Sequence, residues 1–135
     1  MGGDWLRLIP FPGPLREAYA AAPPRWEACR LTYLHLDERG TSVTVGLDTT
    51  DLPAVPPAAW HGEAFNAVQF FLRFDEVRQL RATGWTLSPH TPLTLAAGRD
   101  GMLEVSLGEG PFPFTFHAPT ARVTTVRPYL AACSP

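Results

Sequence analysis

A histidine and a carboxylate lie two positions apart in Trp60-His61-Gly62-Glu63, the part of this sequence that most resembles a reactive site. An imidazole titrates near neutral pH and, with a carboxylate beside it, can act as a general acid or base. The quartet belongs to residues 51–64, a stretch with three prolines that is too long for a tight turn, so we predict an ordered loop. A buried Trp60 would anchor this loop and leave His61 and Glu63 in solvent, and we favour this interpretation over catalysis.

Other residue patterns for catalysis or metal binding are missing from the sequence. The four histidines share none of the spacings typical of zinc ligands, and there is no nucleophile elbow or phosphate-binding glycine loop. Two adjacent carboxylate pairs, Asp37-Glu38 and Asp75-Glu76, lie in predicted turns, where exposed acidic residues are common. We therefore expect no enzymatic activity, no metal and no cofactor.

The cysteines, the apolar runs and the first residues of the sequence indicate in which cellular compartment the protein is expected. Cys29 and Cys133 show neither metal spacing nor a redox motif, and we expect both thiols to be reduced; a disulfide joining the tail to the first strand is the alternative. The sequence has no apolar run of membrane-spanning length and does not begin like a signal peptide. We expect a cytoplasmic protein with no membrane partner.

Charge is distributed unevenly along the chain. The formal net charge is 11 − 13 = −2, which does not suit phosphate binding, so we expect no nucleic-acid partner. Residues 37–63 carry five acidic residues against one arginine, or −4, while the stretches on either side carry +1 each. Such a segment could attract a basic partner or could simply be a solvated hairpin.

Hydrophobic periodicity predicts one helix followed by strands. Residues 15–22, preceded by Pro14, follow a helical spacing. From residue 29 the period changes to two, and a first strand with apolar residues on both sides resembles a central strand, with Leu31, Tyr33 and His35 on one side. A strand at residues 43–47 completes a hairpin, and the strongest alternation, at residues 68–74, should lie in the core.

The later part of the sequence contains further short alternating runs. With these the count reaches seven or eight strands separated by Gly, Pro and Asp. This pattern predicts a mostly β (α+β) fold with antiparallel strands in a sandwich, roll or partly closed barrel, and one short N-terminal helix. The length fits a single domain over residues 1–135.

A recognisable set of residues lies between Pro57 and Trp85. It consists of Pro57-Ala58-Ala59-Trp60, Phe65-Asn66-Ala67-Val68-Gln69, Phe74, Val77, Leu80 and Gly84-Trp85. In these residues the chain resembles the immunity protein 50 family of bacterial polymorphic toxin systems, and the resemblance extends weakly to both sides. It implies a small β-rich protein that protects its producer by binding a cognate toxin, without a reaction.

Three functions remain open at this point. Binding of a cognate toxin predicts contacts on the acidic hairpin and the proline-containing loop that follows it, and we assign them to Asp48, Asp51, Trp60, His61 and Glu63. A small-ligand-binding β-barrel predicts a cavity of roughly 300 Å³ or more, lined by Phe70, Phe112, Phe114 and Phe116. An enzyme with a site at His61 and Glu63 ranks last, and the oligomeric state, monomer or homodimer, is left undecided.

Overall fold

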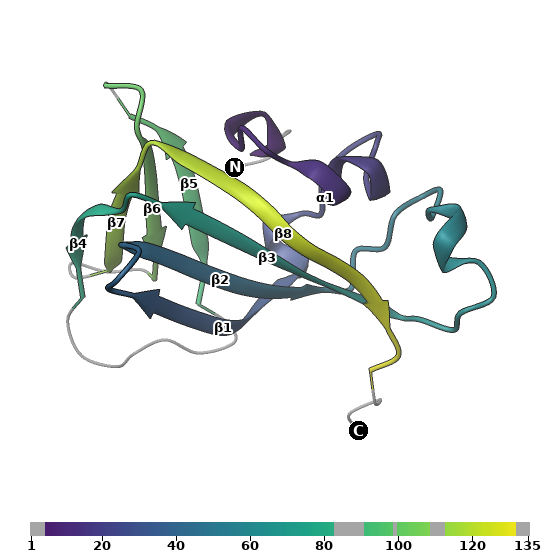
Figure 1. Cartoon of the computed structure of the whole chain (residues 1–135). Helices are drawn as coiled ribbons and strands as arrows, with labels where there is room; N and C mark the ends of the chain where they lie inside the picture. The colour runs from purple at the N-terminus through teal and green to yellow at the C-terminus, as the bar shows by residue number, and fades with distance from the viewer. Residues whose placement is uncertain (1–4, 83–90, 99, 109–112, 132–135) are drawn as a thin grey trace.

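In the described part of the chain, eight strands in two sheets form the framework of the molecule (Figure 1). The structure is a computed structural model of the 135-residue chain and describes residues 5–82, 91–98, 100–108 and 113–131. The first sheet has the order β1-β2-β3-β8 and the second β4-β7-β6-β5, and every strand pair is antiparallel. The bounds are β1 Cys29–Asp37, β2 Ser42–Thr49, β3 Ala67–Asp75, β4 Arg78–Arg81, β5 Leu93–Ala97, β6 Leu103–Leu107, β7 Phe114–Ala118 and β8 Thr120–Tyr129.

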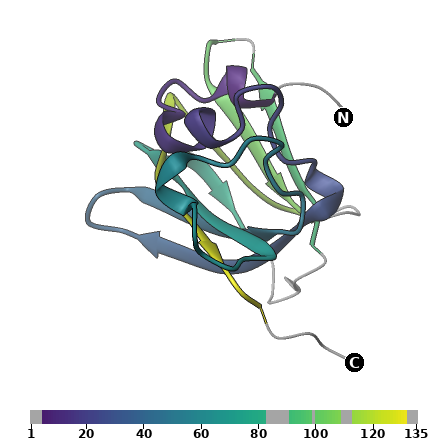
Figure 2. The same ribbon diagram turned by 90° about the vertical axis from the view of Figure 1, so that its right-hand side faces the viewer.

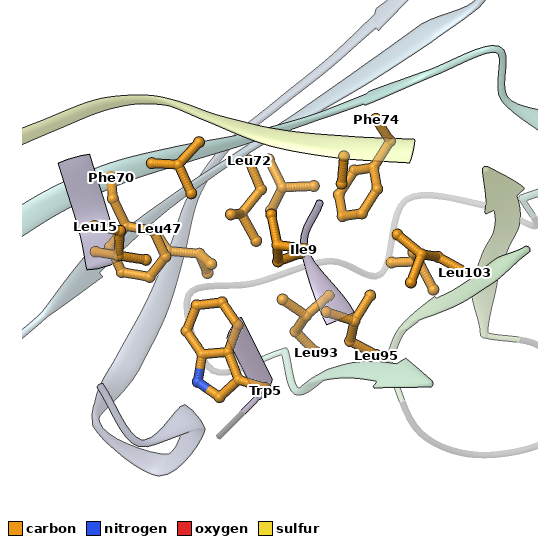
Figure 3. Close-up of a cluster of buried hydrophobic side chains, with 14 of the residues drawn as sticks. Trp5, Ile9, Leu15, Leu47, Phe70, Leu72, Phe74, Leu93, Leu95 and Leu103 are labelled. Atoms are coloured by element: carbon orange, nitrogen blue, oxygen red, sulfur yellow. The ribbon is translucent and has the colours of Figure 1, made fainter. Parts of the chain in front are cut away.

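The two sheets enclose the hydrophobic core, as alternation predicts. In β3, Val68, Phe70, Leu72 and Phe74 are all fully buried, while the residues between them are less so. Figure 3 shows Phe70, Leu72 and Phe74 facing leucines of the second sheet, including Leu95. Each large side chain buried in this way contributes about 1.5–3 kcal/mol to folding. The mostly β fold is confirmed, and among the described residues it takes the form of two packed sheets and not a closed barrel.

The N-terminal segment fills the space that the shorter second sheet leaves open. It contains η1 (Trp5–Leu8), α1 (Gly13–Ala18) and η2 (Trp26–Ala28), and Figure 1 shows it beside β8 and β5. The Trp5 ring stacks on Trp26 at 4.1 Å and near Phe70 at 6.1 Å, and its indole N–H donates to the Pro24 carbonyl. The N-terminal segment is thus part of the core.

The helix is shorter than the periodicity predicts. It ends at Ala18 and not at residue 22, because Tyr19 leaves helical geometry at φ −115° and ψ 61°. The Tyr19 ring is buried and its hydroxyl donates to the Asp51 carbonyl at 2.8 Å, so a tertiary contact replaces the last helical turn.

The prediction that the first strand is central was wrong. β1 is an edge strand, and five of its nine residues are exposed. A bulge at Thr32 shifts the register, so that Leu31 pairs with Leu47 on the inner side while Tyr33 pairs with Gly46 on the outer side. One extra residue in a strand reverses the side of everything after it, which is why simple alternation misassigned Tyr33 and His35.

Candidate partner-binding surface

The five residues predicted to contact a partner all lie on or beside the connection between β2 and β3. Pairing of Thr49 with Val68 closes the base of this loop, residues 50–66, which contains η3 (Ala58–Trp60). Figures 1 and 2 show that the loop projects from one end of the first sheet, next to the N-terminal segment.

Trp60, His61 and Glu63 are on the projecting part of the loop. The Trp60 ring packs edge-to-face on Phe65, with 5.5 Å between the ring centroids, and is half-buried where full burial was expected. The backbone amides of His61 and Glu63 donate to Ala58 and Trp60 carbonyls, while both side chains are exposed. The backbone of this tip is therefore hydrogen-bonded, and its polar groups face solvent.

Asp51 is an internal anchor of the loop. Its carboxylate accepts from the backbone N–H of Arg25 at 2.9 Å and from the Arg25 guanidinium at 3.3 Å. Its own amide donates to the Thr49 hydroxyl, and its carbonyl accepts from Tyr19. Burial, and next the Asp51 charge, raise the pKa of Tyr19, which keeps this hydroxyl a donor. These contacts tie the loop to the N-terminal segment.

Asp48 has an internal partner as well. It lies on β2, and the Tyr129 hydroxyl of β8 donates to its carboxylate at 2.5 Å. This hydrogen bond, together with burial, raises the pKa of Tyr129 to about 12. The second carboxylate oxygen of Asp48 is buried and has no hydrogen-bond partner among the described residues.

The other root of the loop is held by the C-terminal segment. Asn66 accepts from the Ala131 amide at 2.7 Å through its side-chain oxygen and donates to the Ala131 carbonyl at 3.2 Å. Its backbone amide donates to the Tyr129 carbonyl. A backbone-binding role for Asn66 is predictable from its residue type, but its partner, 65 residues away, is not.

The acidic segment of the sequence is divided in space. Asp37 and Glu38 lie at the turn that joins β1 to β2, whereas Asp51 and Glu63 lie beyond the opposite end of β2. Eight residues of strand separate these two groups by roughly 25 Å. The −4 stretch therefore does not form one acidic patch, and its strand residue Asp48 pairs with Arg30 on one side.

The phenylalanines expected to line a ligand cavity pack in the core wherever the structure describes them. These are Phe70, Phe114 and Phe116, while Phe112 lies outside the described residues. The concavities found are surface grooves of about 360 Å³ beside Trp26 and Pro92, and about 370 Å³ between Tyr19 and Val55. The described phenylalanine side chains therefore fill the space between the two sheets instead of lining a cavity.

In the part of the chain that the structure describes, no three His, Cys, Asp or Glu side chains come together to hold a metal ion. No helix in the described ranges is both long and apolar enough to cross a bilayer. Cys29 is a free, half-buried thiol whose pKa burial raises to about 12, while Cys133, His90 and Trp85 lie outside the described residues.

Comparison with known proteins places this geometry in context. A family model described as Immunity protein 50 matches residues 13–129, from the start of α1 to the end of β8. The match therefore includes both sheets and the projecting loop. No curated protein and no solved structure matches the chain.

Proposed function

Because the chain belongs to the immunity protein 50 family, we propose that it protects a bacterial cell by binding a cognate toxin of a polymorphic toxin system. The protein acts in the cytoplasm and occludes the toxin without a chemical reaction. The family match over both sheets carries this proposal, because it concerns the whole fold and not a short motif.

The loop between β2 and β3 supports a binding role. A half-buried tryptophan next to exposed polar groups has the composition of an interface hot spot with a polar rim. Both roots of the loop are fixed, by Asp51 on one side and Asn66 on the other. A loop that is already ordered loses little conformational entropy on binding, which favours tight association.

Within the predicted contact set, we propose two tasks. Trp60, His61 and Glu63 would touch the toxin, with Trp60 as the central contact and the others at the rim. Asp48 and Asp51 are partly buried at the base of the loop, and we propose that they contribute mainly by holding it in place.

Co-expression tests the proposal. The chain is produced together with the toxic domain encoded beside its gene, and growth rescue and co-purification are scored. We expect rescue and a stable one-to-one complex. A folded chain that neither rescues growth nor binds the toxin would overturn the immunity function.

Loop variants test the contact site. Substitution W60A, H61A and E63A together should weaken binding by more than tenfold, since a single hot-spot residue contributes about 2 kcal/mol or more. The matched control is T94A and E104A, two exposed positions of the second sheet. Equal binding by the loop variant and the control would remove the loop from the interface.

A further inference from the structure

The first sheet has an outer side that turns away from the second sheet and the core. Three rows of the cross-strand register define this side, which we call the open face. Its rows are Arg30-Asp48-Gln69-Arg127, Tyr33-Gly46-Phe71-Thr125 and His35-Thr44-Arg73-Arg122. Seven of these twelve residues are exposed, and the only buried one is Gly46, which has no side chain.

Aromatic side chains occupy the middle of the open face. The rings of Tyr33 and Phe71 meet edge-to-face across Gly46, with 5.5 Å between centroids. A Cβ at Gly46 would lie 2.5 Å from the Phe71 ring and 2.6 Å from Tyr33 Cβ, so these two side chains occupy the space that the glycine leaves. Tyr33 is 46% exposed, which is high for an aromatic residue held in place by packing.

Arginines flank the aromatic row on both sides. The twelve residues contain four arginines and one aspartate, or 4 − 1 = +3, while the whole chain carries −2. Asp37 and Asp75 at the hairpin end reduce the local sum to +1, which leaves −3 for the remainder of the chain. Folding therefore gathers positive charge on the open face of a chain whose net charge is negative.

Three of these four guanidinium groups are held by side-chain contacts, and all four arginines are exposed. Arg73 and Arg122 both contact the Asp75 carboxylate, at 3.0 and 3.4 Å, and their side chains remain 46% and 53% exposed. Arg127 donates to the Gln69 side chain at 3.1 Å. Fixed arginines with free N–H groups bind carboxylates in pairs of hydrogen bonds, and tyrosine and arginine are enriched in protein interfaces.

We propose that the open face binds an acidic surface of the cognate toxin. This inference rests on the proposed immunity function and names the chemistry of the partner. The loop adjoins the face, because Asp48 and Gln69 lie where β2 and β3 enter and leave the loop. A basic face beside a loop that exposes the Glu63 carboxylate would orient a toxin that carries the opposite pattern.

Two other occupants suit the open face less well. Nucleic acid would bring phosphates near Asp48 and Asp75, and the aromatic rings pack on each other instead of lying flat as platforms for bases. A second copy of the chain docked face to face would place arginines against arginines, at a cost in free energy.

Charge variants test the proposal with purified toxin. R30Q/R127Q removes two positive charges from the face, and T125E adds a carboxylate to the aromatic row at an exposed position. The controls R78Q/R81Q and T94E make the same charge changes at exposed positions of the second sheet. Thermal unfolding confirms that each variant folds, and association rates are measured at low and high salt.

We expect the face variants to associate about tenfold more slowly at low salt, with a weaker salt dependence, and the controls to match the wild type. Toxin binding by the wild type with unchanged rates in both face variants would overturn this inference and leave the immunity function standing. Absence of wild-type binding would overturn both. Binding of single-stranded RNA or DNA, or a wild-type dimer, that R30Q/R127Q abolishes would assign the face to those occupants instead.

Discussion

Replacement of Gly46 by alanine should destabilise the protein, because the open face has no space for a methyl group there. The new Cβ would lie 2.5 Å from Phe71 Cε1, 2.6 Å from Tyr33 Cβ and 2.8 Å from Phe71 Cδ1. Carbon atoms normally approach to about 3.5–4.0 Å, so each neighbour must move by about 1 Å. The Phe71 ring can rotate outward, but Tyr33 Cβ moves only with the β1 backbone.

The net cost follows from two opposing terms. Overpacking of this kind lowers the free energy of unfolding by about 1–3 kcal/mol. Alanine is less flexible than glycine in the unfolded chain, which raises the free energy of unfolding by about 0.4–1 kcal/mol. We expect a loss of about 1–2 kcal/mol in the free energy of unfolding, measured by urea denaturation. With a urea slope of about 2 kcal/mol/M, the midpoint should fall by about 0.5–1 M.

A control and a double variant sharpen this test. Gly40→Ala should change the stability by less than about 0.5 kcal/mol, because its added Cβ meets only side-chain atoms at 3.9 Å. Phe71→Ala removes two of the three close contacts at Gly46, so Gly46→Ala should cost less in that background. A Gly46→Ala cost below about 0.5 kcal/mol, or an equal cost in both backgrounds, would refute the reasoning.

Two further predictions concern the thiol and the loop root. Burial raises the pKa of Cys29 from 9.0 to about 12, so the folded state favours the protonated thiol. The stability that this protonated thiol contributes is complete below pH 9 and is lost as the pH rises toward 12. The free energy of unfolding, measured with urea, should therefore fall less steeply between these pH values in Cys29→Ala than in the wild type. An equal dependence on pH in the two proteins would contradict the raised pKa. Asn66→Ala removes two hydrogen bonds to Ala131 and should cost about 1 kcal/mol. Amide hydrogen exchange near Ala131 should then be faster in Asn66→Ala than in the control variant Thr124→Ala, which changes an exposed residue of β8. Equal protection in the two variants would show that Asn66 does not hold this segment.

Local sequence patterns predicted the strands and the hairpin of β1 with β2, but not the other strand pairings. The alternation in residues 68–74 reports which side chains turn inward, because successive side chains of a strand point to opposite sides. It contains no information about pairing, and β3 lies between β2 and β8, the latter some 50 residues further along the chain. The edge position of β1 depends on this long-range order, which explains why apolar residues on both of its sides were misleading.

Local sequence patterns also could not predict how the loop between β2 and β3 is anchored. Asp51 and Asp48 were predicted as contacts because they are acidic and adjacent to a loop. The structure gives each a partner distant in sequence: Arg25 is 26 residues from Asp51, and Tyr129 is 81 residues from Asp48. Residue type indicated that these carboxylates take part in polar interactions. Only the tertiary structure shows that they bind partners within the protein, Arg25 and Tyr129, and so hold the loop.

This separation changes how an experiment on the acidic residues should be interpreted. A variant with alanine at Asp48, Asp51 and Glu63 would remove one exposed rim charge, one loop anchor and one carboxylate from a basic face. Slower toxin association in that variant would follow from lost steering or from a displaced loop, so it would not identify the contact. Glu63→Ala alone reports on the rim, because the Glu63 side chain is exposed and Asp51 remains bonded to Arg25. Asp48→Ala, in contrast, makes the open face more positive, and it should strengthen attraction to an acidic toxin surface wherever the fold tolerates the loss of the bond to Tyr129.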